Sequence, residues 1–215
     1  MKKIPAQNIG EAVFDVLYLL FAFIAGILII AKSGGSAGIA LFGAAAVVLG
    51  AGDSFHLVPR VAGGLSGHPN EKALGKGKLV TSVTMTLFYV LLYYAGALLF
   101  KWNVPVIMHI AVIGLAVVRI ALCLCPQNGW TSEEPSYKWN IIRNIPFTLL
   151  GIVVLIAYAA GASGPLSLAW LAILLSFGFY IPVVLFAGKY PATGALMIPK
   201  TCAYIWLVAM GFGLV

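Results

Sequence analysis

The chain has 215 residues, of which 62% are hydrophobic and only 9% are charged, and its formal net charge is +7. A mean hydropathy of +1.04 excludes a soluble globular domain and indicates a membrane protein. The positive charge does not call for a nucleic-acid partner, because the anionic headgroups of membrane lipids attract basic residues equally well.

Seven apolar stretches are long enough to cross the hydrocarbon core of a bilayer, which takes about 20 residues of helix. Membrane barrels need alternating apolar residues instead, and the stretches lack that alternation. We therefore predict an all-α fold in which residues 1–215 form a single domain, a bundle of seven transmembrane helices. In chain order the expected helices are 11–31, 36–60, 78–100, 103–125, 138–160, 165–187 and 195–215.

Lysine and arginine residues fall almost entirely on one side of these helices. Only Lys32 and Lys101 lie at the other side. Because short loops rich in Lys and Arg stay in the cytoplasm, this bias predicts a cytoplasmic N-terminus and an outer C-terminus, in a cell membrane such as the bacterial inner membrane. The side predicted to be cytoplasmic carries Lys2, Lys3, Arg60, Lys72, Lys76, Lys78, Arg119, Lys138, Arg143, Lys189 and Lys200.

Polar side chains gather in the same half of the predicted helices. In the first helix they recur every three or four residues, which places them on one face: Asn8, Glu11, Asp15 and Tyr18. The later helices add polar groups at a similar depth: Asp53, His56, Arg60, Thr81, Ser82, Thr84, Thr86, Arg119, Asn140, Arg143, Asn144, Lys200, Thr201 and Tyr204. In the outer halves the one ionisable side chain is His109.

Charged residues within membrane spans are costly, and they usually face a bundle interior or a wet cavity. We therefore expect a polar cavity open to the cytoplasm and closed before the outer surface. Its expected ligand-binding residues are Glu11, Asp15, Arg60, Arg119, Arg143 and Asn144. A plainer interpretation applies to Lys138, Arg143 and Lys200, whose long side chains can reach water from the membrane interface.

The segment Gly50–Arg60 is the densest in polar groups. Asp53 and His56 lie one turn apart, so they can form a carboxylate–imidazole pair in which the ring becomes a better base. We take these two residues as the candidate catalytic pair, although such a pair also satisfies a buried histidine. We predict that Asp53 lies within ion-pair reach of at least one of His56, Arg60, Arg119 or Arg143, because an unpaired buried carboxylate is expensive.

Two further features concern the chain between the polar groups. Pro146 and Pro182 lie inside predicted helices and should bend them near the cytoplasmic end. Residues 62–78 contain five glycines and several basic residues, and we expect a mobile loop there.

No metal or other cofactor is predicted, since His56, His109 and Asp53 are too dispersed to close a metal site.

The Gly52-Asp53 pair, at the inner end of the second span, resembles the Gly-Asp motif of YhhN-type lysoplasmalogenases, which are multi-pass membrane lipid hydrolases. The resemblance covers about ten residues, and it implies hydrolysis of a lipid. The His-x-x-x-His motif that closes the related ceramidase superfamily is absent from the last span of this chain.

Three functions fit the pattern. In the first, the protein binds, and as an enzyme hydrolyses, an amphiphilic or anionic lipid-like ligand from the inner leaflet, with the arginines holding the anion. In the second, it carries a small solute or protons, for which intramembrane Asp, Glu and His are usual relay residues. In the third, it is a structural or assembly protein without a substrate, and its ion pairs serve packing alone. Membrane lipids are expected partners in all three.

The orientation can be tested by labelling single cysteines on intact cells, in a chain whose native cysteines are replaced. We expect Lys32→Cys to react with an impermeant thiol reagent from outside, whereas Lys72→Cys reacts only after the cells are opened. Labelling of Lys72→Cys from outside would contradict the predicted orientation.

Overall fold

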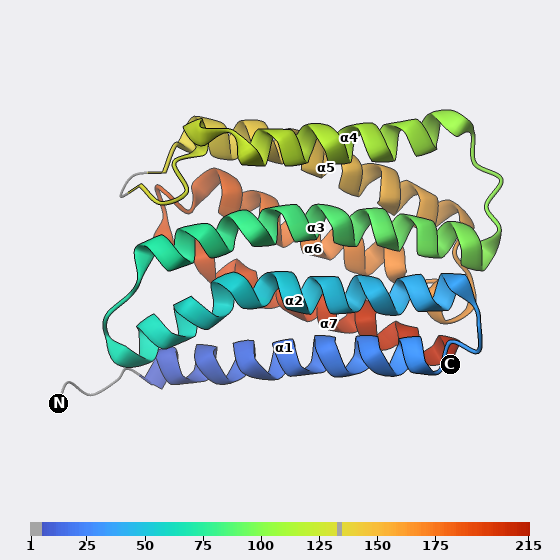
Figure 1. The fold of residues 1–215 in the computed structure, drawn as a ribbon, viewed down its shortest axis with the longest axis horizontal. Helices are drawn as coiled ribbons and strands as arrows, with labels where there is room; N and C mark the ends of the chain where they lie inside the picture. Colours follow the sequence, from blue (N-terminus) through green and yellow to red (C-terminus); the bar gives the residue numbers. More distant parts are fainter. Residues whose placement is uncertain (1–5, 133–134) are drawn as a thin grey trace.

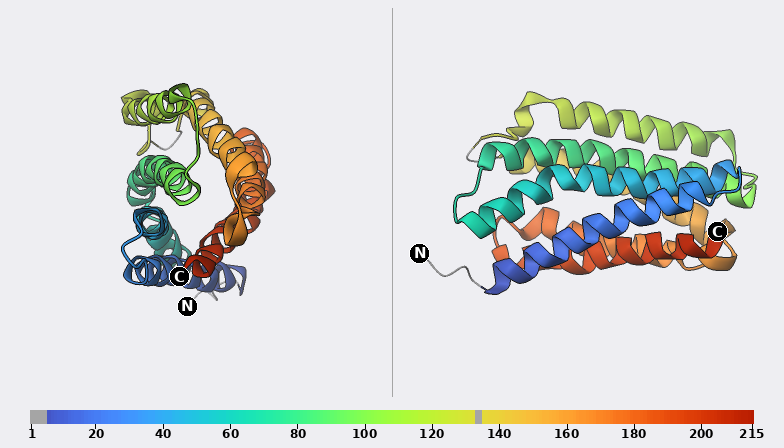
Figure 2. Two further views of the ribbon diagram at one scale, coloured as in Figure 1. Left: turned by 90° about the vertical axis from the view of Figure 1, so that its right-hand side faces the viewer. Right: turned by 60° about the horizontal axis from the view of Figure 1, so that its bottom comes forward.

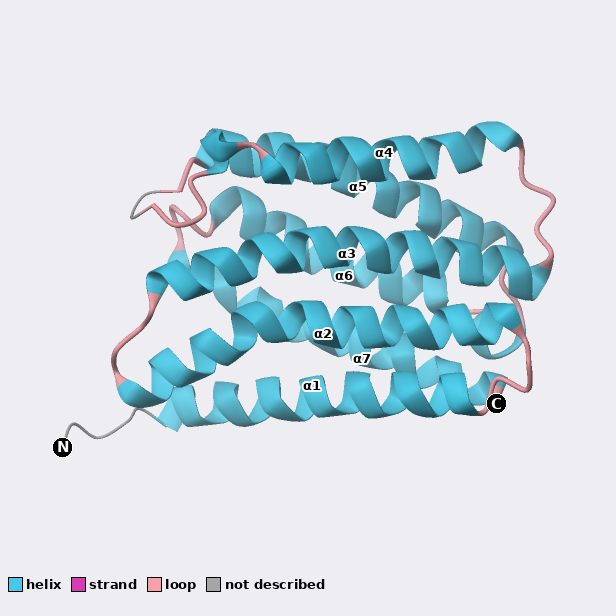
Figure 3. Ribbon diagram, viewed as in Figure 1, coloured by secondary structure: helices cyan, strands magenta, loops and turns pink. Residues whose placement is uncertain are grey.

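The computed structural model describes residues 6–132 and 135–215, which form seven long helices joined by short connections (Figure 1). The helices are α1 (Ala6–Ala31), α2 (Ala37–Ser66), α3 (Glu71–Phe100), α4 (Val106–Leu124), α5 (Tyr137–Gly161), α6 (Ala169–Phe186) and α7 (Met197–Met210). Short 3-10 helices are η1 (Pro126–Asn128), η2 (Gly164–Leu166), η3 (Pro191–Leu196) and η4 (Gly211–Leu214). The part of the chain described here contains no strand (Figure 3).

These observations confirm the all-α prediction. All seven helical segments are long and apolar enough to cross a membrane, counting η2 with α6 and the flanking 3-10 turns with α7. The chain is therefore indicated to be a multi-pass membrane protein. Large apolar side chains remain exposed along the outward faces of the helices, as on α4 at Val106, Ile107 and Val117. Such faces suit a lipid environment.

The helices follow one another around a ring. Seen end-on, α1 to α4 form one side and α5 to α7 the other, and α7 returns to lie against α1 (Figure 2). Because the number of long helices is odd, α1 begins at one end of the bundle and α7 runs out at the other (Figure 1). The connections α2–α3, α4–α5 and α6–α7 share the end where α1 begins. We call this end the basic end, since nearly all described Lys and Arg residues lie toward it.

The loop expected at residues 62–78 is mostly helical, so that prediction was wrong. α2 continues through Pro59 to Ser66, and α3 already begins at Glu71, which leaves residues 67–70 as the connection. Gly67 ends α2 with a positive φ of 72°, a conformation that glycine adopts without strain. The side chain of Asn70 then accepts a hydrogen bond from the backbone N–H of Ala73 and starts α3.

Both prolines lie within helices, and the bends expected at them stay a prediction. Pro146 lies inside α5 and Pro182 lies inside α6. The carbonyl groups at the end of α6 are partly satisfied by the beginning of α5, because Tyr137 donates to the carbonyl of Leu185 and Asn140 donates to that of Val184. Side chains at the start of α5 thereby cap the C-terminal end of α6.

Helices α2 and α3 approach each other closely through two glycines. A Cβ atom added at Gly77 would overlap the carbonyl oxygen of Phe55, and one added at Gly52 would overlap the side chain of Thr84. Both helices therefore pack backbone against backbone next to Asp53 and His56. This close packing fixes the part of α2 that carries the candidate catalytic pair.

The close approach predicts the effect of one added methyl group. Gly77→Ala should lower the free energy of unfolding by about 1–3 kcal/mol, the usual cost of overpacking. Thermal unfolding in detergent measures it. Gly114→Ala on α4 is the matched control, because nothing lies within 4 Å of the added methyl group there. Equal stability of the two variants would contradict the packing described.

Candidate functional site

A small cavity lies at the basic end between α1, α2 and α7. Its volume is about 30 Å³, enough for one or two water molecules. We call it the acid–lysine cavity. The residues that line it are Glu11, Phe14, Asp15, Asp53, His56, Leu57, Arg60, Met197, Ile198, Lys200 and Thr201.

Asp53 forms the buried floor of this cavity and is only 4% exposed. Its Oδ2 accepts a hydrogen bond from the hydroxyl of Tyr18 at 2.7 Å. Its Oδ1 is buried and has no hydrogen-bond partner in the described structure, although the Nδ1 atom of His56 lies 3.9 Å away. The prediction that Asp53 lies within ion-pair reach of one of four named residues is thus confirmed, through His56.

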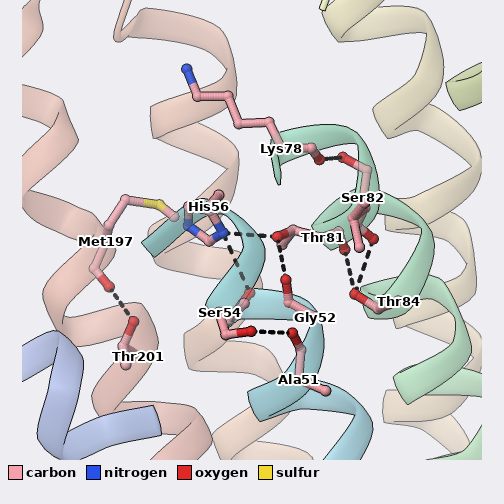
Figure 4. A network of polar contacts seen from close by, with 12 residues as sticks. Ala51, Gly52, Ser54, His56, Lys78, Thr81, Ser82, Thr84, Met197 and Thr201 are labelled. Carbon is pink, nitrogen blue, oxygen red and sulfur yellow. Dashed lines mark hydrogen bonds and ion pairs between the residues drawn. The ribbon is translucent and has the colours of Figure 1, made fainter. Parts of the chain in front are cut away.

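His56 makes its hydrogen bond to Thr81 rather than to Asp53. The distance from Nδ1 to the Thr81 hydroxyl is 2.8 Å, and that hydroxyl donates its one hydrogen to the carbonyl of Gly52 at 2.8 Å (Figure 4). Thr81 must therefore accept from His56, which places a proton on Nδ1. In the neutral ring the other nitrogen, Nε2, is then a free acceptor.

An ion pair stands at the rim of the cavity. Arg60 donates to a carboxylate oxygen of Glu11 at 2.5 Å, and both side chains are partly exposed, by 40% and 30%. One turn further along the two helices, the side-chain amide of Asn8 donates to the carbonyl of Gly64. These contacts join the first turns of α1 to the last turns of α2.

Lys200 is buried, with 8% of its surface exposed, so its interpretation as an interfacial side chain that reaches water was wrong. Its ammonium group lies 5.0 Å from the ring centre of Tyr204 and 5.3 Å from that of Tyr180. Aromatic faces attract a cation at such distances. No carboxylate of the described residues lies within ion-pair distance of this ammonium group.

A second polar group, which we call the arginine cluster, lies between α4, α5 and η1. Arg119 is 1% exposed and donates to the backbone carbonyl of Arg143, in the turn of α5 that contains Pro146. Its guanidinium lies 5.1 Å from the ring centre of Phe147. Arg119 therefore joins α4 to the turn of α5 that contains Pro146.

Arg143 donates to the side-chain oxygens of Asn128 and Asn140, and its guanidinium stacks 4.1 Å from the ring centre of Trp130. Asn128 in turn donates to three carbonyl groups at the end of α4, those of Leu122, Cys123 and Cys125. The cluster therefore caps α4. Neither guanidinium is within ion-pair distance of a carboxylate in residues 6–132 and 135–215.

Asn144 accepts a hydrogen bond from the Tyr180 hydroxyl at 2.9 Å. It lines a hollow of about 240 Å³ between α5 and α6, whose other walls are mostly apolar. Because the hydroxyl of Tyr180 meets Asn144 and its ring lies beside the ammonium group of Lys200, this tyrosine stands between the arginine cluster and the acid–lysine cavity.

The structure thus divides the predicted site. Five predicted residues, Glu11, Asp15, Asp53, His56 and Arg60, line the acid–lysine cavity, whereas Arg119, Arg143 and Asn144 do not. The prediction that one cavity contains all of these residues was wrong. Its position at the basic end agrees with the prediction.

Four important partners were not assigned to the site from the sequence: three of them were counted among the polar groups of the helices, and Tyr180 was missed. These are Tyr18, which holds Asp53, Thr81, which holds His56, and Tyr180 and Tyr204, which flank Lys200. The spacing of Tyr18 with Asp15 is a signal for the first of them. Contacts between helices leave no such signal in the sequence.

Within the described residues, no three His, Cys, Asp or Glu side chains gather closely enough to hold a metal ion. Comparisons with known proteins add no assignment, since no protein-family model, no curated protein and no solved structure matches the chain.

The division into two groups predicts different roles for their cations. Arg119→Gln should lower the apparent melting temperature, because a charged hydrogen bond of about 1.5–3 kcal/mol is lost. Ligand binding at the acid–lysine cavity should persist in the folded variant. Lys138→Gln, an exposed neighbour at the start of α5, is the control and should change stability by less than about 0.5 kcal/mol. An unchanged melting temperature for Arg119→Gln would contradict the role of Arg119 in joining α4 to α5.

Proposed function

We propose that the protein lies in a cell membrane with its basic end toward the cytoplasm and binds the polar head of a single-chain amphiphile in the acid–lysine cavity. The described Lys and Arg residues at the basic end support this orientation, with Lys32 and Lys101 at the opposite end. The cavity then lies at the depth of the inner-leaflet headgroups, where an amphiphile presents its polar part.

The observation that carries the proposal is the pair of unpartnered carboxylate oxygens on the cavity wall. Asp15 Oδ2 and Asp53 Oδ1 are buried without a hydrogen-bond partner among the described residues. Buried acceptors are nearly always satisfied by protein, water or ligand. These two oxygens are acceptors beside an open volume, where a ligand can donate to them, and this favours a binding site over packing alone.

The rim of the cavity supports an amphiphilic ligand. Phe14 of α1 and Met197 and Ile198 of α7 contribute apolar side chains to the lining, and Ile198 is 40% exposed. A ligand whose head meets the carboxylates can therefore lay its chain along the outer surface between α1 and α7. The cavity is too small to hold the chain itself.

A carrier needs a polar path onward from the cavity, and the one hydroxyl chain near Lys200 ends inside the bundle. Ser176 donates to the carbonyl of Ile173, so it accepts from Tyr89, which in turn accepts from Tyr204. The chain of donors thus stops at a backbone carbonyl. Farther out, His109 packs against the rings of Tyr93 and Tyr94. These contacts favour a binding site over a carrier.

Hydrolysis at the same cavity is a second candidate function, favoured by the fixed tautomer of His56. With its Nδ1–H held by Thr81, the free Nε2 can take a proton from a water molecule as that water attacks an ester-type bond of the ligand. Asp53, 3.9 Å from the ring, would stabilise the imidazolium formed. The Gly52-Asp53 resemblance to lysoplasmalogenases points to the same class of reaction.

Binding can be measured with a fluorophore at the rim and a spin-labelled single-chain amphiphile as quencher, in lipid nanodiscs. The fluorophore is attached to Ile198→Cys in a chain without its native cysteines. We expect quenching that saturates and that an unlabelled single-chain amphiphile reverses, because the ligand occupies a defined site.

Leu124→Cys is the matched control, since Leu124 is an exposed residue of α4 at the same end of the bundle. Quenching there should rise in proportion to quencher, as for free partition into lipid. Equal, unsaturable quenching at both positions would refute the binding site. Hydrolysis is supported if the protein releases product from a single-chain ester and if His56→Gln abolishes this release while quenching persists. If no product is released, the function is binding alone.

A further inference from the structure

The charges around the acid–lysine cavity do not balance. The described residues that line it include three carboxylates, Glu11, Asp15 and Asp53, but two cations, Arg60 and Lys200. Glu11 and Arg60 pair with each other at the rim at 2.5 Å. Asp15, Asp53 and Lys200 remain deeper in the cavity, and with both carboxyl groups ionised they carry one negative charge more than positive.

Lys200 does not neutralise both buried carboxylates. Its ammonium group is held between the faces of Tyr180 and Tyr204, on the α7 side of the cavity. It makes no ion pair within 4.0 Å with Asp15 or Asp53. The donor that these two carboxylates require must therefore come from something else in the cavity.

Two buried acceptors mark where that donor binds. Asp15 and Asp53 are 7% and 4% exposed, and each has one oxygen without a hydrogen-bond partner in the described structure. Tyr18 donates to the other oxygen of Asp53, which leaves Oδ1 as the open acceptor. A water molecule would supply donors but would leave the excess negative charge unchanged.

The volume limits the size of the occupant. About 30 Å³ accommodates a group the size of a water molecule, and a primary ammonium group is of that size. A trimethylammonium or a phosphate group is several times larger. The size, the charge and the two acceptors together select a small monovalent cation with N–H donors.

We propose that the acid–lysine cavity binds a primary ammonium group, and that the amphiphile of the proposed function is a single-chain amine. The hydrocarbon chain of the ligand rests on the proposed function, because a small cation without such a chain carries the same charge. Asp15 and Asp53 hold the ammonium group, while Phe14 and Ile198 contact the beginning of the chain. An anionic headgroup is excluded, because it would face two carboxylates.

Chain-matched probes test the headgroup. In the same nanodisc assay, dodecylamine should displace the spin-labelled amphiphile at least tenfold more effectively than dodecanol, dodecyl phosphate or dodecyltrimethylammonium. Asp53→Asn should reduce the dodecylamine advantage by roughly tenfold to a hundredfold, as expected for loss of a charged hydrogen bond. Asp15→Asn is a second variant of the same kind, for use if Asp53→Asn does not fold.

Glu71→Gln is the matched control, because it removes one exposed carboxylate in the first turn of α3, outside the cavity. Its preference for dodecylamine should equal that of the unmodified protein. A preference that survives in both Asp15→Asn and Asp53→Asn would overturn the assignment of the carboxylates.

The remaining outcomes distinguish the choice of an amine headgroup from the proposed binding of an amphiphile. If dodecanol or dodecyl phosphate binds as tightly as dodecylamine, the amine headgroup is wrong and amphiphile binding stands. If methylammonium, which has no chain, raises the melting temperature as much as dodecylamine and Asp53→Asn abolishes that rise, the cation site stands and the amphiphile is wrong. If no probe binds saturably, both are wrong.

Discussion

The structure depends on one constraint: inside an apolar environment, every buried polar group needs a partner from the protein. The basic end shows how the chain meets it. Asn128 covers three carbonyl groups at the end of α4, and Tyr137 and Asn140 cover the end of α6. Arg119 reaches the turn of α5 that contains Pro146. Five buried side-chain atoms of the described residues still lack a hydrogen-bond partner: the acceptors Asp15 Oδ2 and Asp53 Oδ1, and the donors Trp102 Nε1, Arg119 Nε and Arg143 Nε.

The unpartnered acceptors and most of the unpartnered donors lie on different sides of the ring. The arginine cluster belongs to α4, α5 and η1, and its other N–H groups donate to asparagine oxygens and a backbone carbonyl, while both guanidinium groups lie against aromatic rings. The acid–lysine cavity belongs to α1, α2 and α7 and leaves two carboxylate acceptors beside its open volume. One side of the bundle therefore uses most of its polar groups to join helices, whereas the other leaves carboxylate oxygens facing a cavity.

Much of the fold follows from the sequence, because apolar length and charge bias act along one dimension. The seven spans and the basic end could be predicted in that way. The ends of α2 and α3 could not, since turns beyond the apolar stretch depend on caps such as Gly67 and Asn70. The prediction that Arg119 and Asp53 line the same cavity was wrong. Two residues at a similar depth can lie on helices that are rotated differently or that stand at different places in the ring. Tyr18 and Thr81 were missed as partners for the same reason: their contacts cross between helices.

The glycine contacts between α2 and α3 have a mechanical consequence. Gly77 lies against the backbone of Phe55 and Gly52 lies against the side chain of Thr84, so these two helices form one tightly packed unit that carries Asp53, His56 and Thr81. The walls that α1 and α7 contribute differ in how they are joined to this unit. α1 is joined to α2 by the close backbone contact of Gly26 with Gly43 and by the hydrogen bond from Tyr18 to Asp53. Among the described residues α7 makes no hydrogen bond to α2, so a change in the width of the cavity falls to α7 while the hydrogen bonds of the floor stay intact.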